Sequence, residues 1–394
     1  MQIKRVYIGG WFQRTTLHLS EMYDFLREGT SALDLNKAKL LQLHTDLEVL
    51  SANLKLDDLE YIALETKNGI SIKISEDGLI MLDKEANDAD VLESDIKSLT
   101  DYYENHLSPA FGYLFSLGAP VPKELANIKT IYPYFVVVQH ASQEDVGALL
   151  EKFGEKKYLE VAHERFDLFR GDKFYLINEK RETDERVGRF IEEQIFVREF
   201  KGQLHRYLNL HRIIWERIAE SKERGSISGR EVGGFHDKIE GYQKTINLIE
   251  GRINQMSAYL ATRERIVKND DRLKDFLGLL EYRYEALGDT LSYVKEIWGM
   301  TKNYVGSALD LFTSLQAQAT QNSVKNLTVV TSMGVGATLI GLFTTAAAPQ
   351  FTDFGIEYFL ILVFIGYAAN KITTWFYGRK SYKISEVAYD KDIK

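Results

Sequence analysis

Oxygen-bearing side chains recur at helical spacing in the least polar part of this sequence. Residues 326–352 contain no charged residue, and within them one helical stripe is formed by Leu327, Thr331, Val335, Thr338, Leu342 and Thr345. Threonine hydroxyls at this spacing can offer a row of neutral oxygen atoms to a hydrated divalent cation. The same threonines equally fit close helix packing with hydrogen bonds between helices, so both interpretations stay open here.

The composition and motifs of the chain exclude most kinds of catalytic and metal site. The chain has 394 residues and no cysteine, which excludes a disulfide scaffold, a thiolate metal site and a cysteine nucleophile. His205 and His211 face different sides of a helix, and no His-Glu-x-x-His pattern or phosphate loop occurs. The sequence therefore predicts a protein that is not an enzyme and has no resident cofactor. The net charge of −8 argues against a nucleic-acid partner.

The stripe requires a helix, and its surroundings predict one that crosses a lipid bilayer. At about 1.5 Å per residue, residues 327–348 can cross a hydrocarbon core of about 30 Å. Pro349 ends this first apolar segment. A second apolar segment covers 358–378, with Lys371 placed to reach the headgroups. Two transmembrane helices joined by a short external loop, 349–357, follow from this pattern.

Charges flanking the two segments predict their orientation. Lys325 precedes the first segment and the tail, residues 379–394, begins with basic residues before it becomes acidic, whereas the connecting loop offers Asp353 and Glu357. The positive-inside rule then places both termini in the cytoplasm, and the two carboxylates at an external mouth. The N-terminus shows no apolar signal segment. We expect a multi-pass protein of a plasma (inner) membrane.

Long helices are expected between the N-terminal part and the membrane. Residues 181–270 predict an antiparallel helical pair with a loop at 225–234, and 271–326 predict a stalk that continues as one helix over 271–348. An apolar heptad repeat this long indicates a supercoiled or bundled helix that needs a partner. Its seam residues are Leu273, Leu277, Leu280, Tyr284, Leu287, Leu291, Val294, Trp298, Thr301, Val305, Ala308, Phe312 and Leu315.

The N-terminal part, 1–180, has the texture of an α/β domain. Short β-rich runs, YIALET, ISIKIS and LIMLDK, are separated by Asn-Gly and Asp-Gly turns and predict an antiparallel meander. Helical patterns lie at 31–54, 88–107 and 143–153. The predicted fold class is therefore an α+β cytoplasmic domain followed by long antiparallel, coiled-coil-like helices and a two-helix transmembrane hairpin.

This layout resembles the CorA-type magnesium and divalent-cation transporter family. ALDLF at 308–312 is similar to a stalk motif of that family, and KNLT at 325–328 matches its K-x-L-T at membrane entry. Thr338 falls where a pore-facing threonine is common, and GRKSYK at 378–383 stands where the family has a basic cluster. The resemblance covers the stalk and the apolar segments well and the N-terminal part by architecture.

The resemblance implies a homopentamer in the lipid bilayer, with the stripe as pore lining, that moves Mg²⁺ or a related ion such as Co²⁺, Ni²⁺ or Zn²⁺. It also implies that carboxylates of the cytoplasmic domains bind the cation and favour the closed state. Hard cations need several converging oxygens, and the candidates for such a regulatory site are Asp88, Asp90, Asp270 and Asp271. Each pair also fits an ordinary solvated turn.

One motif of that family is missing. Where a Gly-Met-Asn motif closes the first span in the family, this sequence has Thr345, Ala346 and Ala347. The resemblance therefore lacks the ring of asparagine amides at the outer mouth, and it is a resemblance to a divergent member of that family. The alternative function is a membrane-anchored structural or interaction protein that retains the fold and does not transport.

Overall fold

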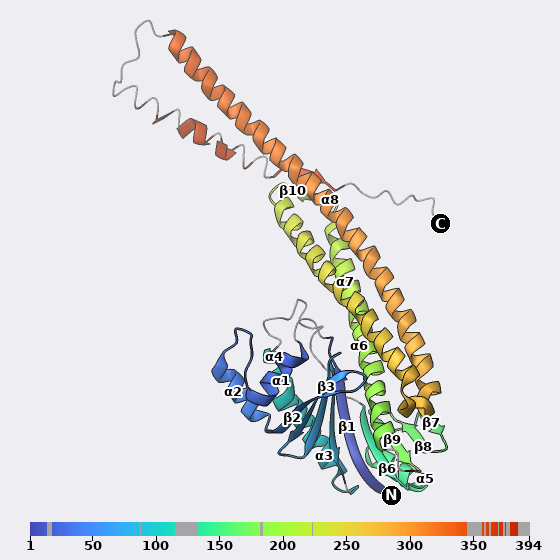
Figure 1. Ribbon diagram of the computed structural model, residues 1–394. Coiled ribbons are helices and arrows are strands. Elements are labelled where there is room, and N and C mark those ends of the chain that lie inside the picture. Colours follow the sequence, from blue (N-terminus) through green and yellow to red (C-terminus); the bar gives the residue numbers. More distant parts are fainter. Residues whose placement is uncertain are drawn as a thin grey trace, which may run out of the picture. The chain divides into compact units, whose positions relative to one another are not determined.

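The computed structural model describes residues 1–13, 18–86, 88–114, 133–181, 184–222, 224–344 and 379–384, with parts of 357–375 (Figure 1). The chain divides into two compact units. Unit 1 combines Met1–Leu208 with Leu248–Lys295, and unit 2 combines Asn209–Asn247 with Glu296–Lys394. Three long helices contribute residues to both units.

Unit 1 is built on a nine-stranded mixed sheet with the strand order β2-β3-β4-β5-β1-β6-β9-β8-β7. Neighbouring strands are antiparallel except β6 and β9, which pair in parallel. The strands are β1 Gln2–Trp11, β2 Val49–Leu56, β3 Glu60–Thr66, β4 Ile70–Ser75, β5 Leu79–Glu85, β6 Tyr134–Gln139, β7 Leu159–Ala162, β8 Phe166–Arg170 and β9 Phe174–Glu179.

The predicted meander is confirmed by β3, β4 and β5. Ile62 lies opposite Ile74, which in turn lies opposite Ile80, so alternate residues of the three strands share one buried face. The two connecting turns place Gly69 at φ 70° and Gly78 at φ 93°, a conformation that glycine adopts without strain. The turn residues therefore set the register that buries these isoleucines.

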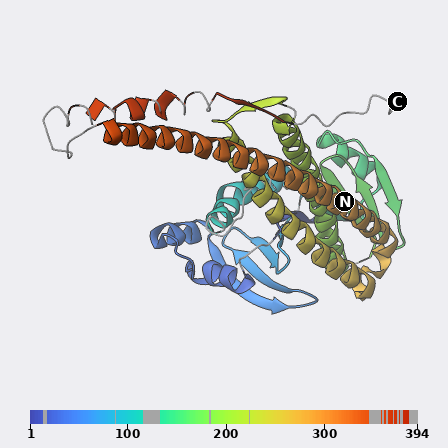
Figure 2. The same ribbon diagram turned by 90° about the horizontal axis from the view of Figure 1, so that it is seen from above.

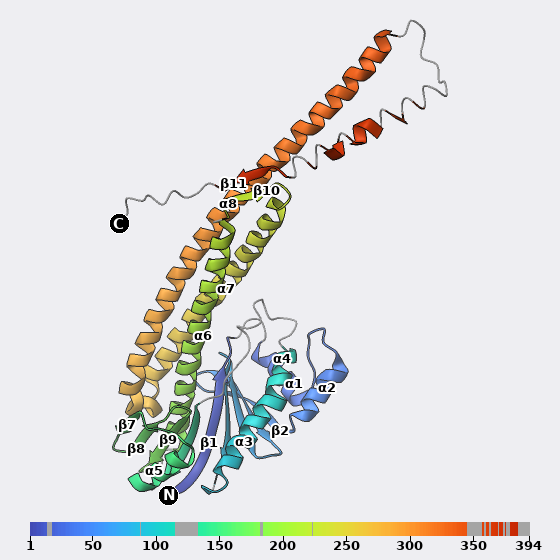
Figure 3. The ribbon, with the colours of Figure 1, turned by 180° about the vertical axis from the view of Figure 1, so that it is seen from behind.

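Short helices cover one face of the sheet (Figure 3). One hydrophobic core cluster joins Val6 and Leu82 of the sheet to Phe25, Leu99 and Leu149 of the helices. The π-helix η1 continues directly from α3 into α4. The helices are α1 Leu19–Glu28, α2 Lys37–Asp46, α3 Leu92–Tyr102, η1 Tyr103–Leu107, α4 Ser108–Leu114 and α5 Gln143–Lys152.

The opposite face of the sheet packs against the parts of α6 and α7 that belong to unit 1. The Trp11 ring lies 5.5 Å from that of Phe196 and 6.1 Å from that of Tyr259. At Gly9 a Cβ atom would lie only 2.5 Å from the backbone oxygen of Ile80 and 2.8 Å from Cδ1 of Ile195, so the neighbouring strand and the helix both require glycine there. Unit 1 thus has three layers, with the sheet in the middle.

The long helices are α6 Asp184–Lys222, α7 Val232–Asn269 and α8 Leu277–Thr344. The predicted seams of α6 and α7 are buried, with Phe200 and Leu204 on α6, and Ile249 and Ile253 on α7, at most 1% exposed. Along α8 the heptad positions bury Leu280, Tyr284, Leu287, Leu291, Val294, Trp298, Thr301, Val305, Ala308, Phe312 and Leu315. The heptad prediction is therefore confirmed as a buried stripe from Leu280 onward, while Leu277, the first residue of α8, is only half-buried.

Two predicted helix boundaries are wrong. The pattern at 31–54 predicted one helix, but α2 ends at Asp46 and the chain turns through Glu48, at φ 50°, into β2. Pairing with β3 overrides the helical pattern there. The helix predicted from 271 starts as a 3₁₀ helix, η3 Asp271–Phe276, whose N-cap Asp270 accepts a hydrogen bond from the backbone N–H of Arg272.

In unit 2 the segment predicted as a loop at 225–234 contains a short strand. This strand, β10 Ser226–Ser228, pairs antiparallel with β11 Ser381–Lys383, beside α8 (Figure 2). Ile227, Tyr382 and Ile384 are buried at this pairing. The segment after the second apolar stretch is therefore bound to the tip of the α6–α7 hairpin.

The coarser part of the predicted fold class, an α+β domain followed by long helices, is confirmed. Among the residues that the structure describes, no helix combines the length and the apolarity needed to cross a membrane. The hairpin of 327–348 and 358–378 therefore stays a proposal.

Candidate functional site

The predicted pore stripe lies mostly on α8. Thr331 and Val335 are exposed, and Val335 retains 59% of its surface. The Thr331 hydroxyl donates to the backbone oxygen of Thr328 at 3.2 Å, so it has a partner within its own helix. Glu357 is exposed. Outside the described part lie the side chains of Leu327, Thr338 and Leu342, together with Thr345 and Asp353.

The basic segment after the second apolar stretch is held by two elements of unit 2. The backbone N–H of Gly229 donates to Lys380 O at 3.0 Å, and Asn322 on α8 donates through Nδ2 to the Tyr382 hydroxyl at 3.0 Å. The Arg379 guanidinium lies 4.1 Å from the ring centre of Trp375, in cation–π contact with it. The β10–β11 pairing therefore fixes this segment against α8 at the point where the uncharged stretch of α8 begins.

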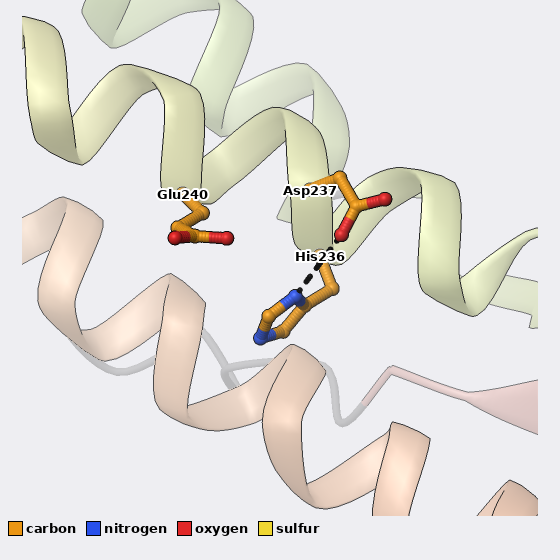
Figure 4. Close-up of side chains that lie close together, drawn as sticks. All are labelled: His236, Asp237 and Glu240. Carbon is orange, nitrogen blue, oxygen red and sulfur yellow. Dashed lines mark ion pairs between the residues drawn. The ribbon is translucent and has the colours of Figure 1, made fainter.

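A possible metal centre lies on the first turns of α7. His236, Asp237 and Glu240 each place a ligand atom within 4.8 Å of the others (Figure 4). His236 and Glu240 are one turn apart and therefore share a side of the helix, while Nδ1 of His236 lies 3.5 Å from Oδ1 of Asp237. An imidazole with two carboxylates suits Zn²⁺, Co²⁺ or Ni²⁺ better than Mg²⁺, which prefers oxygen ligands.

The packing of α7 fixes this cluster on one side, while Lys244 competes for it on the other. Phe235, next to His236, stacks on Phe312 of α8 with ring centres 5.8 Å apart. Lys244 Nζ lies 2.9 Å from Glu240 Oε1, and this hydrogen bond lowers the pKa of Glu240. A cation must displace Lys244 to use that carboxylate. The sequence carries a signal for this centre, a His and a Glu four residues apart, which neither a His-Glu-x-x-His pattern nor an acidic pair includes.

The predicted regulatory carboxylates at Asp88 and Asp90 lie in a turn before α3. Asp88 Oδ1 accepts a hydrogen bond from the backbone N–H of Asp90 at 3.2 Å. Asp90 in turn lies 3.6 Å from Lys152 Nζ and is almost fully exposed. Their role in binding a cation stays a prediction.

Asp270 and Asp271 differ in their surroundings. The Asp270 carboxylate accepts hydrogen bonds from Arg189 Nε at 3.2 Å and Arg272 Nε at 2.9 Å, and is 5% exposed. Burial raises its pKa, but the hydrogen bonds from Arg272 outweigh burial and lower it. The exposed Asp271 pairs with Lys274. Asp270 is therefore already neutralised by arginines in this structure, and a cation would have to displace them.

A second ionic cluster is buried between the sheet and the helices of unit 1. Arg263 donates to Asp77 through Nε at 2.7 Å and Nη2 at 3.0 Å, and to Glu193 through Nη1 at 2.8 Å. Tyr284 also donates to Glu193. Burial lowers the pKa of Arg263, but Asp77 and Glu193 outweigh burial and raise it. This cluster joins the β4–β5 turn to three helices.

No family model matches this chain, and no curated protein matches it. A CorA magnesium transporter structure from Methanocaldococcus jannaschii aligns with 11% identity and a TM-score of 0.25, covering 64% of this chain and 92% of that one. The soluble domain of CorA from the same organism aligns with 10% identity and a TM-score of 0.22, covering 46% and 88%. Likenesses at these TM-scores do not establish a shared fold.

Proposed function

We propose that this protein moves divalent cations across a membrane as a homopentamer, with the α8 stripe lining the path. The observation that carries the proposal is the continuity of α8 in unit 2, where the buried heptad seam ends at Leu315 and the uncharged stretch follows within the same helix. Val324 and Val335 are more than half exposed there. Such an apolar face requires a cover, and lipid together with neighbouring copies would supply one.

The cation would interact with this path through neutral oxygens. The threonines of the stripe offer hydroxyls but no charge, which suits an ion that keeps part of its water shell. Glu357, at the predicted external loop, and the His236 centre, on the cytoplasmic side, would be further contacts for a divalent ion. Because a cell interior is negative, entry of a divalent cation needs no coupled ion.

Flux of Mg²⁺, Co²⁺, Ni²⁺ and Zn²⁺ into liposomes containing the purified full-length protein tests this function. Thr338→Leu removes a hydroxyl from the stripe and is expected to reduce flux about tenfold, the effect of a barrier raised by about 1.4 kcal/mol. Thr344→Leu is the matched control, because residue 344 lies off the stripe on the same helix.

Absence of flux for every ion, from protein that is assembled and inserted, would refute transport. The missing Gly-Met-Asn motif, replaced by Thr345-Ala346-Ala347, would then favour the alternative, a membrane-anchored structural or interaction protein. Equal loss in Thr338→Leu and Thr344→Leu would refute the assignment of the stripe as the pore face.

A further inference from the structure

Two buried arginines lie about three turns apart on α7 and therefore on the same side of the helix. Arg252 and Arg263 are 3% and 1% exposed, respectively, and both belong to unit 1. Arg263 is matched by the carboxylates of Asp77 and Glu193. In contrast, Nε, Nη1 and Nη2 of Arg252 are all buried, and among the described residues their polar neighbour is the hydroxyl of Tyr207 rather than a carboxylate.

The surroundings of Arg252 are polar but carry no compensating charge within the described part of the chain. The nearby Tyr207 phenol is neutral, and its hydroxyl donates to Gln13 Oε1 at 2.8 Å. The Gln13 amide donates to the backbone oxygen of Arg252. Arg206 adds a second positive charge next to the Tyr207 phenol. The positive charges of Arg252 and Arg206 therefore both lie next to the phenol of Tyr207.

Arg252 does not become neutral by losing its proton. Burial lowers the pKa of Arg252, but a guanidinium remains protonated in proteins even so. A buried charge without a partner strongly disfavours the folded state. On the same helix, the charge of Arg263 is balanced by hydrogen bonds to the carboxylates of Asp77 and Glu193. Arg252 therefore requires an anion from outside the described residues.

We propose that the Arg252 guanidinium binds a compact oxyanion in the interior of unit 1, beside the Tyr207 hydroxyl and with Arg206 as a second positive charge. The planar fork of arginine matches two oxygens of a phosphate or carboxylate group, which gives two parallel charged hydrogen bonds. Because the nitrogens are buried, the anion enters by local opening and exchanges slowly. The site does not depend on whether the protein transports cations.

Inorganic phosphate is the probe, titrated against the full-length protein in detergent at constant ionic strength set by chloride. We expect the thermal unfolding midpoint to rise and saturate, because phosphate binds the folded state. Arg252→Met keeps the length of the side chain and removes the charge. This variant should lose the saturable rise, with phosphate affinity reduced by about ten- to hundredfold. In phosphate-free buffer it should unfold above the wild type, because an uncompensated charge is gone.

Arg265→Met is the matched control, since Arg265 is exposed on the same helix. Phosphate stabilises many proteins by exclusion from their surface, and that effect would raise the midpoints of all three proteins equally. An equal rise, or no rise at all, overturns the proposal. If Arg252→Met does not fold, Arg252→Lys replaces it: the charge stays but the fork is lost, and phosphate should bind more weakly than to wild type. Unchanged phosphate binding by Arg252→Lys would equally overturn the proposal.

Discussion

Replacing Arg263 by methionine should strongly destabilise unit 1. The substitution removes the guanidinium while leaving Asp77 and Glu193 buried, with side-chain exposures of 4% and 0%. Breaking a buried ion pair on one side costs about 3–5 kcal/mol, because the remaining charge has lost both water and partner. The two carboxylates would then be close together without a cation.

The expected loss can be checked against the free energy of protonation. Keeping a carboxyl group protonated at pH 7 lowers the free energy of unfolding by about 1.4 kcal/mol for each pH unit above the ordinary pKa of that group. For one buried carboxyl this amounts to roughly 3–4 kcal/mol. The hydroxyl of Tyr284 still donates to Glu193, and the backbone N–H of Leu79 still donates to Asp77 at 3.2 Å. We therefore expect a loss of about 4 kcal/mol at pH 7.

The loss should shrink with acidification. Burial already raises the pKa of Glu193 in the wild type, and removal of Arg263 raises it further. A carboxyl with a raised pKa in the folded state weakens folding above its unfolded pKa and has no effect below it. The difference in free energy of unfolding between the wild type and the Arg263→Met variant should therefore fall to about 1–2 kcal/mol at pH 5.

Urea unfolding followed by tryptophan fluorescence measures this loss directly. Trp11 Nε1 donates to the backbone oxygen of Asp77 at 2.8 Å, so one reporter lies within the cluster itself. Lys268→Met is the control on the same helix, because it removes an exposed pair with Glu264 and should leave the unfolding midpoint unchanged. A variant as stable as the wild type, or a loss that is independent of pH between 5 and 8, would refute this account of the cluster.

Two further outcomes follow from the described side chains. Burial raises the pKa of Asp83 to about 6 although Arg5 lies at 2.7 Å, so stability should fall as the pH rises from about 4 to about 6. Asp83→Asn should flatten that part of the curve of unfolding midpoint against pH, and a curve unchanged by the substitution would contradict the shift. At the candidate metal centre, His236→Ala should weaken Co²⁺ binding to the full-length protein by at least about tenfold, measured from the visible absorbance of the bound ion. His205→Ala, which removes an exposed histidine elsewhere, should not, and equal affinities would exclude the centre.

Periodicity was sufficient to predict much of the helical body. Apolar residues at heptad spacing mark one side of a helix regardless of what covers it, and Tyr284, Leu291 and Phe312 are buried as the pattern requires. The meander was predictable for a similar reason, since alternation and Asn-Gly or Asp-Gly turns are local. The helical pattern at 31–54 failed at β2, because pairing with β3 is a tertiary contact.

Contacts between distant segments carried no sequence signal. β10 and β11 are three-residue strands, too short for an alternating pattern, and they pair across the whole of α7 and α8. The hydrogen bond between Asn322 and Tyr382 is equally invisible before folding. The His236 centre differs, because its ligands are neighbours in sequence, and a His and a Glu one turn apart on a predicted helix are visible before folding.

The two buried arginines of α7 show where inference from sequence stops. Arg252 and Arg263 lie on one side of the helix, and their neighbours Ile249, Ile253 and Leu260 identify that side as buried. Sequence therefore indicates that both arginines need counter-charges, but it does not say which segment provides them. Asp77 reaches Arg263 from a tight turn of the sheet, a contact that follows only from the packing of three layers. No carboxylate among the described residues pairs with Arg252, so two chemically identical side chains on one side of a helix differ in whether the fold itself supplies their counter-charge.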